Sequence, residues 1–256
     1  MSKEQSDDRE REFKFATDRD LEDVLDVCRR EVRQGWHLVQ FQPRTVQDIY
    51  FDTPDLALAR TGSCLRFRKR RVNKGWTANY KDGEVESEKD FVDRREVITQ
   101  VSVEEAQRFA TGVVPGLAWS LAVEALGGGA DLRLVPIVQI ETSRRGWSVR
   151  AGRLDDRQNN YVGLVWDRGL ASACDTDGAL FLLANGGADW TARRQAEFAI
   201  DNYELESDGR SVDDEAGSVE AVRRLAAVLT DELGVEVLRR SKYQAALDGL
   251  RIGAGR

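Results

Sequence analysis

The chain has 256 residues, of which 41% are hydrophobic and 32% are charged, and its formal net charge is −7. This composition predicts a globular protein, and no apolar run is long enough to span a bilayer. The negative charge argues against a broad nucleic-acid-binding surface. We expect a single domain over residues 1–256, without a membrane or nucleic-acid partner. Because the charged segment Met1–Arg11 does not resemble a secretory signal, we also expect a cytoplasmic location.

A strand is predicted over Glu10–Lys14, with side chains alternating between two faces. One face then carries only Glu10, Glu12 and Lys14, while arginines and phenylalanines occupy the other. A strand usually has one apolar and one polar face, so an entirely ionic face indicates charged groups opposite it. The same pattern recurs in two further stretches, at Arg66, Arg68 and Arg70, and at Glu204 and Glu206.

Two interpretations of these ionic faces are open from the residues alone. The strands can belong to one open antiparallel sheet whose charged faces meet solvent. Alternatively, they enclose a lumen in which carboxylates bind divalent cations and arginines bind a polyanion. Acids and bases lie on different strands, which favours the lumen, because a face built only for solubility would mix the two signs.

After the first strand, apolar residues at helical spacing predict a helix over Asp18–Arg33 that ends at Gly35. The stretch Leu38–Phe51 is rich in β-forming residues and is interrupted near Pro43, so it contains one long strand or two short ones. A turn follows, and Asp55 is expected to cap a short helix that extends through Arg60 and ends at Gly62.

The rest of the chain alternates strands with helices. Ser102 and Glu105 form a predicted capping box at the start of a helical insertion over residues 102–126. A later helix starts at Ser218 and closes at Gly234. The predicted strands are Leu65–Arg71, Trp76–Lys81, Phe91–Val97, Val135–Thr142, Val162–Asp167 and Phe198–Ser207.

Three cysteines and one histidine offer little chemistry. Cys28, Cys64 and Cys174 are odd in number and widely spaced, which argues against a disulfide framework or a zinc site. His37 has no accompanying pattern of a nucleophile and an acid. Any chemistry is therefore expected to use carboxylates, lysine or metal-bound water.

Two stretches together resemble a known family. The run Tyr50-Phe51-Asp52-Thr53-Pro54-Asp55-Leu56, followed by Leu65-Arg66-Phe67-Arg68, resembles the signature of the CYTH superfamily, also called triphosphate tunnel metalloenzymes. The opening Glu10-x-Glu12-x-Lys14 is similar to its N-terminal hallmark. The resemblance implies an α+β fold: a closed eight-stranded antiparallel β tunnel, with helices packed outside, that binds a triphosphate and a divalent metal.

The resemblance also implies roles for individual residues. A cradle for the phosphates would consist of Lys14, Arg66, Arg68, Lys81, Arg144 and Lys242. Ligands for Mg²⁺ or Mn²⁺ would be Glu10, Glu12, Glu204 and Glu206, with Glu96 and Asp167 as further acidic candidates. The catalytic set would be Glu10, Glu12, Lys14, Arg66, Arg68 and Lys81. Two alternatives stay open, because Arg145 competes with Arg144 for the lumen and Asp167 can equally be a turn residue before Gly169.

The function implied is metal-dependent hydrolysis of a small-molecule triphosphate, with inorganic tripolyphosphate converted to pyrophosphate and phosphate. Thiamine triphosphatase and class IV adenylyl cyclase activities are alternatives within the resemblance. A different class of explanation is a non-catalytic module that binds triphosphate or polyphosphate. The two acidic strands argue against such a module, because surplus carboxylates hinder the binding of a polyanion. We expect a monomer or a homodimer.

Overall fold

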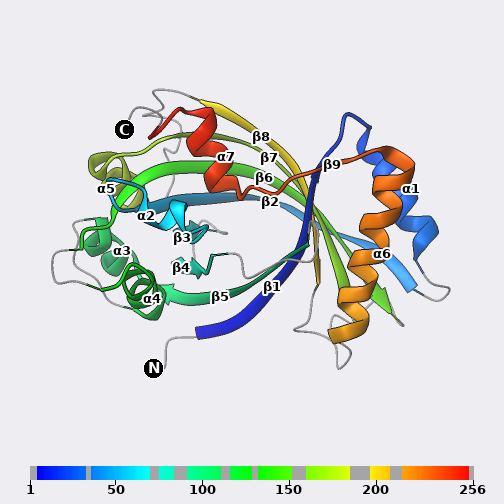
Figure 1. The fold of residues 1–256 in the computed structure, drawn as a ribbon, viewed down its shortest axis with the longest axis horizontal. Helices are drawn as coiled ribbons and strands as arrows, with labels where there is room; N and C mark the ends of the chain where they lie inside the picture. The colour runs from blue at the N-terminus through cyan, green and yellow to red at the C-terminus, as the bar shows by residue number, and fades with distance from the viewer. Residues whose placement is uncertain are drawn as a thin grey trace.

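The computed structural model describes residues 5–32, 36–69, 75–83, 91–110, 116–128, 132–151, 160–184, 197–207 and 215–253 (Figure 1). The strands are β1 (Gln5–Ala16), β2 (Trp36–Asp52), β3 (Cys64–Lys69), β4 (Trp76–Lys81), β5 (Phe91–Val101), β6 (Val135–Ala151), β7 (Asn160–Ala173), β8 (Phe198–Ser207) and β9 (Glu236–Val237). The helices are α1 (Leu21–Glu31), α2 (Ala57–Arg60), α3 (Val103–Ala110), α4 (Leu117–Ala125), α5 (Thr176–Ala184), α6 (Glu215–Leu233) and α7 (Lys242–Gly249).

Eight of these strands close into an antiparallel barrel. Their order is β5-β4-β3-β2-β6-β7-β8-β1, and β1 also pairs with β5. The short β9 pairs with the end of β1 at Phe15 and Ala16. The predicted α+β class, a closed eight-stranded tunnel with helices around it, is therefore confirmed. None of the helices in the described ranges has the length and apolar character needed to cross a membrane.

Strand alternation separates an apolar exterior from an ionic interior. On β1, Phe13 and Phe15 join an outer cluster with helices α1 and α6, while the buried side chains of Glu12 and Lys14 face inward. Helices α3, α4 and α5 cover another part of the exterior, next to β3 and β4. Figure 1 shows these two helix groups at opposite ends of the molecule. Helices thus cover the apolar outer face of the barrel, and polar and charged side chains occupy the inner face.

Helix α7 closes one end of the lumen. Tyr243 packs with Val138 and Tyr50, and the rings of Tyr50 and Tyr243 stack with centroids 4.9 Å apart. Ser241 caps the helix in a box with Gln244, because each side chain accepts a hydrogen bond from the other residue's backbone N–H. This packing directs the first residue of α7, Lys242, into the cavity.

The stretch around Pro43 belongs to one long strand with a bulge. In the pairing of β2 with β6, Phe41 lies opposite Gly146 and Arg44 lies opposite Arg144. Three steps along β2 therefore match two along β6, which places one extra residue at the bulge. The alternative of one long strand is correct, and the interruption seen in the sequence is the bulge.

Some predicted boundaries are corrected by the structure. Helix α1 is shorter than Asp18–Arg33, and Gly35, its predicted end, lies outside the described residues. Strand β6 runs nine residues past Thr142, to Ala151. Strand β7 runs from Asn160 to Ala173, so Asp167 lies in mid-strand and its interpretation as a turn residue is wrong. Arg70, in the predicted basic row, also lies outside the described residues.

The expected cap at Asp55 is also wrong. Leu56 occupies the position before α2, and the Asp55 carboxylate instead accepts a hydrogen bond from Arg60 at 2.6 Å. The amides at the start of α2 are satisfied by Asp52, whose oxygens accept from the N–H groups of Leu58 at 2.8 Å and Ala59 at 3.0 Å. The preceding turn brings this buried carboxylate under the helix. The capping box at Ser102 and Glu105 is confirmed.

Candidate active site

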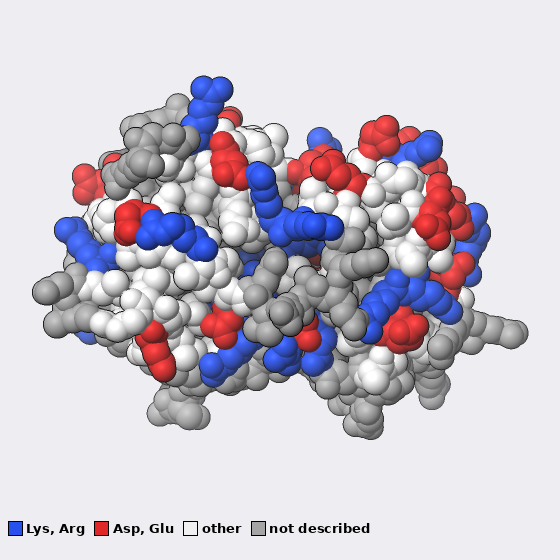
Figure 2. All heavy atoms as spheres, viewed as in Figure 1, with Lys and Arg blue, Asp and Glu red and all other residues white. Residues whose placement is uncertain are grey.

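The barrel encloses a small cavity, and most of the residues that line it are charged. Figure 2 shows Lys and Arg side chains gathered near the centre of the face that carries the β9–α7 connection. The residues that line the cavity are Glu10, Glu12, Lys14, Tyr50, Cys64, Arg66, Arg68, Lys81, Arg94, Arg144, Glu204, Glu206, Ser241 and Lys242.

Strands β1 and β8 bring three carboxylates together. Glu12 lies opposite Glu206 in the strand register, and one oxygen from each of Glu10, Glu12 and Glu206 lies within 4.8 Å of the others. Carboxylate oxygens at this spacing are the hard donors that Mg²⁺ and Mn²⁺ take. The donor set therefore fits the divalent metal implied by the resemblance.

Glu206 differs from the other acids of the lumen. Within the part of the chain that the structure describes, its carboxylate forms no hydrogen bond or ion pair. Burial, followed by repulsion from Glu204, raises its pKa to about 7. For Glu10, burial opposes ionisation, but Lys81 and Arg94 outweigh it and hold the pKa well below its ordinary value. Glu206 is thus an ionisable oxygen donor beside other acids, and the charge of Arg144, which favours its ionised form, does not outweigh burial and their repulsion.

The arginines of β3 lie against acids from neighbouring strands. Arg68 donates two hydrogen bonds to Asp48, both at 2.7 Å, in the bidentate geometry that guanidinium groups form with carboxylates. Arg66 lies 3.8 Å from Asp48 and 3.5 Å from Glu96. Glu96 also accepts a hydrogen bond from Asn79 at 3.1 Å. The predicted basic strand is therefore inward-facing at both described arginines.

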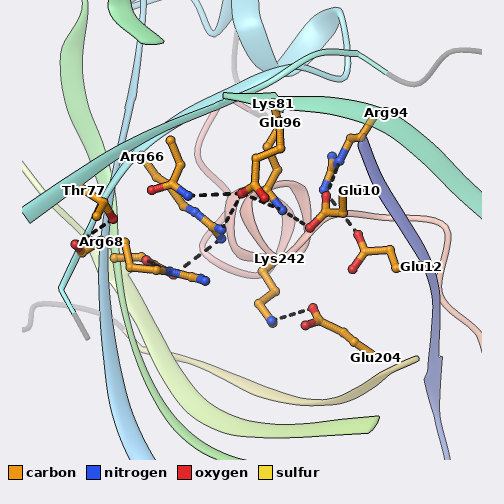
Figure 3. Close-up of polar contacts among 12 residues, drawn as sticks. Glu10, Glu12, Arg66, Arg68, Thr77, Lys81, Arg94, Glu96, Glu204 and Lys242 are labelled. Carbon is orange, nitrogen blue, oxygen red and sulfur yellow. Dashed lines mark hydrogen bonds and ion pairs between the residues drawn. The ribbon is translucent and has the colours of Figure 1, made fainter. Parts of the chain in front are cut away.

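Lys81 and Arg94 converge on the acids of β1. Lys81 contacts Glu10, and Arg94 donates to Glu10 at 2.7 Å and to Glu12 at 3.5 Å (Figure 3). Lys14 pairs with Glu12 on its own strand. Arg94 was not among the predicted site residues, although it shares a strand face with Glu96, and that parity was the signal that could have identified it.

A second ionic group joins β6, β7, β8 and α7. Arg144 donates to Asp167 at 2.8 and 2.5 Å and to Glu204 at 3.1 Å. Lys242 donates to the same two acids, at 2.5 and 2.6 Å. For Glu204, burial opposes ionisation, but Lys242 and Arg144 hold its pKa well below the ordinary value. Arg145 is exposed and lies over the outer ring of Trp166, so Arg144 is the arginine that faces the lumen.

The structure brings all of the predicted site residues to one place. Ten of the twelve line the cavity, and the other two, Glu96 and Asp167, are paired with its cations. Asp48 and Tyr50 are lumen residues that the sequence reasoning missed. Strand alternation places them on one face of β2 with Arg44, and this row of polar side chains was the signal that could have identified them. The catalytic, phosphate-binding and metal-binding roles of the twelve stay predictions.

So many buried ion pairs require a reason beyond stability. Desolvation of buried charges offsets most of their attraction, and apolar groups of similar size often stabilise a fold as well or better. The closed barrel and its charged lumen thus define a class of tunnel protein with an ionic interior. A model of the CYTH domain matches residues 8–232, and the chain belongs to this family.

Solved structures with the same fold have low sequence identity to this chain. One is HpAC1 from Hippeastrum, a candidate adenylyl cyclase described as having a dominant triphosphatase activity. It is 15% identical, with a TM-score of 0.52, over 94% of this chain and 96% of that one. Another, a candidate adenylate cyclase from Bacillus halodurans, is 15% identical with a TM-score of 0.51, over 93% and 97%. These likenesses show the fold. The search of curated proteins found no match.

Proposed function

We propose that this protein hydrolyses a triphosphate with the help of a divalent metal, and that inorganic tripolyphosphate is its substrate. The observation that carries the proposal is the meeting of two groups in one cavity: lysines and arginines from five strands and α7, and the three-carboxylate cluster of Glu10, Glu12 and Glu206. Cations alone would suit any polyanion. Glu206 has no ion pair among the described residues, and the metal of a metal–triphosphate complex would supply its positive partner.

Glu10, Glu12 and Glu206, with Glu204 beside them, would hold Mg²⁺ or Mn²⁺. A bound ion of this kind neutralises phosphate oxygens and lowers the pKa of a bound water. Glu206 suits this role because it has no ion pair to give up among the described residues. Glu12 and Glu10 have to release Lys14 and Lys81 to the substrate.

The cradle acts by charge and orientation. Arg66 and Arg68 can each present two parallel N–H donors to a phosphate, while Arg144 projects from β6, on the other side of β2, and Lys242 from α7. Hydrolysis spreads charge over the transferring phosphoryl group and the leaving pyrophosphate, and fixed donors stabilise that charge without reorganising. The closed barrel also limits the access of bulk water to the phosphates.

A substrate screen tests the proposal. The metal-free protein, prepared by dialysis against a chelator, is supplied with Mg²⁺ or Mn²⁺ and offered tripolyphosphate, thiamine triphosphate, nucleoside triphosphates or long polyphosphate. Released phosphate and cyclic nucleotide are both measured. We expect turnover only with metal, and the highest kcat/KM with tripolyphosphate. Full activity without metal would refute metal dependence, and more efficient formation of cyclic AMP from ATP would replace hydrolysis by a cyclase function.

The same screen separates an enzyme from a binding module. Calorimetry on the metal-free and metal-loaded protein measures tripolyphosphate binding independently of turnover. Tight binding with no phosphate release under any metal would establish a non-catalytic module. The enzyme would be supported if Glu12→Gln and Glu206→Gln both lose phosphate release while each metal-free variant still binds tripolyphosphate.

A further inference from the structure

One arginine facing the lumen has no carboxylate partner. Each lysine and arginine that lines the cavity is paired with an acid, but Arg44, on β2, has no ion pair or hydrogen bond within the described residues. Its Nε atom is buried without a hydrogen-bond partner. Arg44 lies directly opposite Arg144 in the strand register. Burial, followed by the charges of Arg144 and Arg68, lowers its pKa.

The β2 bulge and an aromatic ring hold Arg44 in this place. Without the extra residue at the bulge, Phe41 and Arg44 would point to opposite faces, but with it they share the face of Gly146 and Arg144. The guanidinium carbon of Arg44 lies 5.5 Å from the centre of the Phe41 ring. That ring occupies the space above Gly146, where an added Cβ would lie 1.8 Å from it. Glycine at 146 therefore makes room for the ring that supports the arginine.

This arrangement is that of an anion receptor. The charges of Glu206 and Asp167 favour the Arg44 cation but only partly offset burial and the charges of Arg144 and Arg68, so this half-buried cation destabilises the empty protein. It gains most from an anion that several of these cations share. The ring fixes the guanidinium in advance, so less side-chain freedom is lost when an anion binds. A purely structural arginine would instead be expected to pair with a nearby acid.

The position of Arg44 indicates which part of a ligand it would contact. Helix α7 closes the lumen beside Tyr50, whereas Arg44 lies six residues away along β2, about 20 Å at roughly 3.3 Å per residue. Arg44 is not among the residues that line the cavity, but its neighbours Arg144 and Arg68 are. A chain of phosphates blocked at the α7 end would therefore extend past these two arginines toward Arg44.

We propose that Arg44 forms an additional phosphate subsite, so that the tunnel accepts linear inorganic polyphosphates of four or more phosphates and not tripolyphosphate alone. This inference rests on the proposed function, because it assumes that the phosphates lie among the cations of the lumen. It adds a specificity residue at the end of the tunnel away from α7.

Tetrapolyphosphate and tripolyphosphate are the probes that test the subsite. For the parent and for Arg44→Gln, calorimetry on chelator-treated protein gives the affinity for each, and phosphate release with metal gives each kcat/KM. We expect the tetrapolyphosphate-to-tripolyphosphate ratio of affinities to fall about tenfold or more in Arg44→Gln, because one charge-assisted contact is lost. Phe41→Leu, which keeps the arginine but removes the ring, should lower the ratio by a smaller factor.

Arg145→Gln is the matched control, since this arginine lies on β6 beside Arg144 but is exposed on the outer face. Its ratio should equal that of the parent, and circular dichroism should show each variant folded. An unchanged ratio in Arg44→Gln, or an equal loss for both probes, overturns the subsite. If the parent shows no turnover but Arg44→Gln lowers the ratio of affinities tenfold, the proposed hydrolysis is refuted and the subsite is supported.

Discussion

Replacing Glu206 by glutamine should stabilise the metal-free protein while weakening its use of metal. The half-buried carboxylate lies beside Glu204, Glu12 and Glu10, and desolvation followed by this repulsion outweighs the charge of Arg144 and raises its pKa from 4.5 to about 7. An acid with a raised pKa binds its proton more tightly in the folded than in the unfolded state. Its contribution to stability is therefore complete below about pH 4.5 and is lost as the pH rises through about 7.

The size of the effect follows from the two pKa values. Near pH 8, ionising Glu206 in the folded protein costs roughly 3 kcal/mol relative to the unfolded chain, and near pH 5 about 1 kcal/mol. Glutamine keeps the shape and carries no charge. The advantage of Glu206→Gln over the parent should therefore grow by about 2 kcal/mol between these pH values.

Urea unfolding in the presence of a chelator, at both pH values, measures this difference. Glu204→Gln is the matched control, because its carboxylate has two cationic partners, Lys242 and Arg144. Removing it leaves them short of a partner and should destabilise the protein by roughly 3 kcal/mol. If Glu206→Gln also destabilised the metal-free protein, or if its effect did not depend on pH, the assignment of Glu206 as an unpaired acid would be wrong.

Three further outcomes are expected. In Glu204→Gln, the metal concentration for half-maximal rate should rise and kcat should fall about 10²-fold, measured by titrating Mg²⁺ at saturating tripolyphosphate; unchanged values would remove Glu204 from the site. In Arg66→Ala, KM for tripolyphosphate should rise while the metal requirement stays close to the parent's, and a shift in the metal requirement alone would contradict the cradle. In Asp52→Ala, the amides of Leu58 and Ala59 lose their acceptor, so urea unfolding should show a free energy of unfolding lower by about 2 kcal/mol. An unchanged free energy of unfolding would show that water replaces the carboxylate.

Strand parity made much of the site predictable. Glu10, Glu12 and Lys14 face inward because alternate residues of a strand share a face, and the same rule places Arg66 with Arg68 and Glu204 with Glu206. The motif around Asp52 and the N-terminal hallmark then indicated the closed barrel. Neither the parity nor the resemblance predicted which strands lie beside one another in the barrel.

What parity could not predict depends on irregular backbone and on long-range contacts. Phe41 lies on the lumen face beside Arg44 only because the bulge shifts the register of β2, and a proline in the sequence does not tell on which side the extra residue falls. The Asp55 cap failed because Asp52, earlier in the turn, satisfies the same amides. The pairing of Lys242 with Asp167 and Glu204 requires the docking of α7, which no local pattern encodes.

The closure of the barrel at β1 bears on how the molecule folds. β1 pairs on one side with β5 and on the other with β8, so its neighbours come from the middle and the far part of the chain. Non-local pairings of this kind raise the contact order and slow folding, because loop entropy is lost before the contacts form. Until β8 is available, one edge of β1 is open to pairing with another chain. Refolding should therefore become less efficient as protein concentration rises, with closure of the edge between β1 and β8 as the step that competes with aggregation.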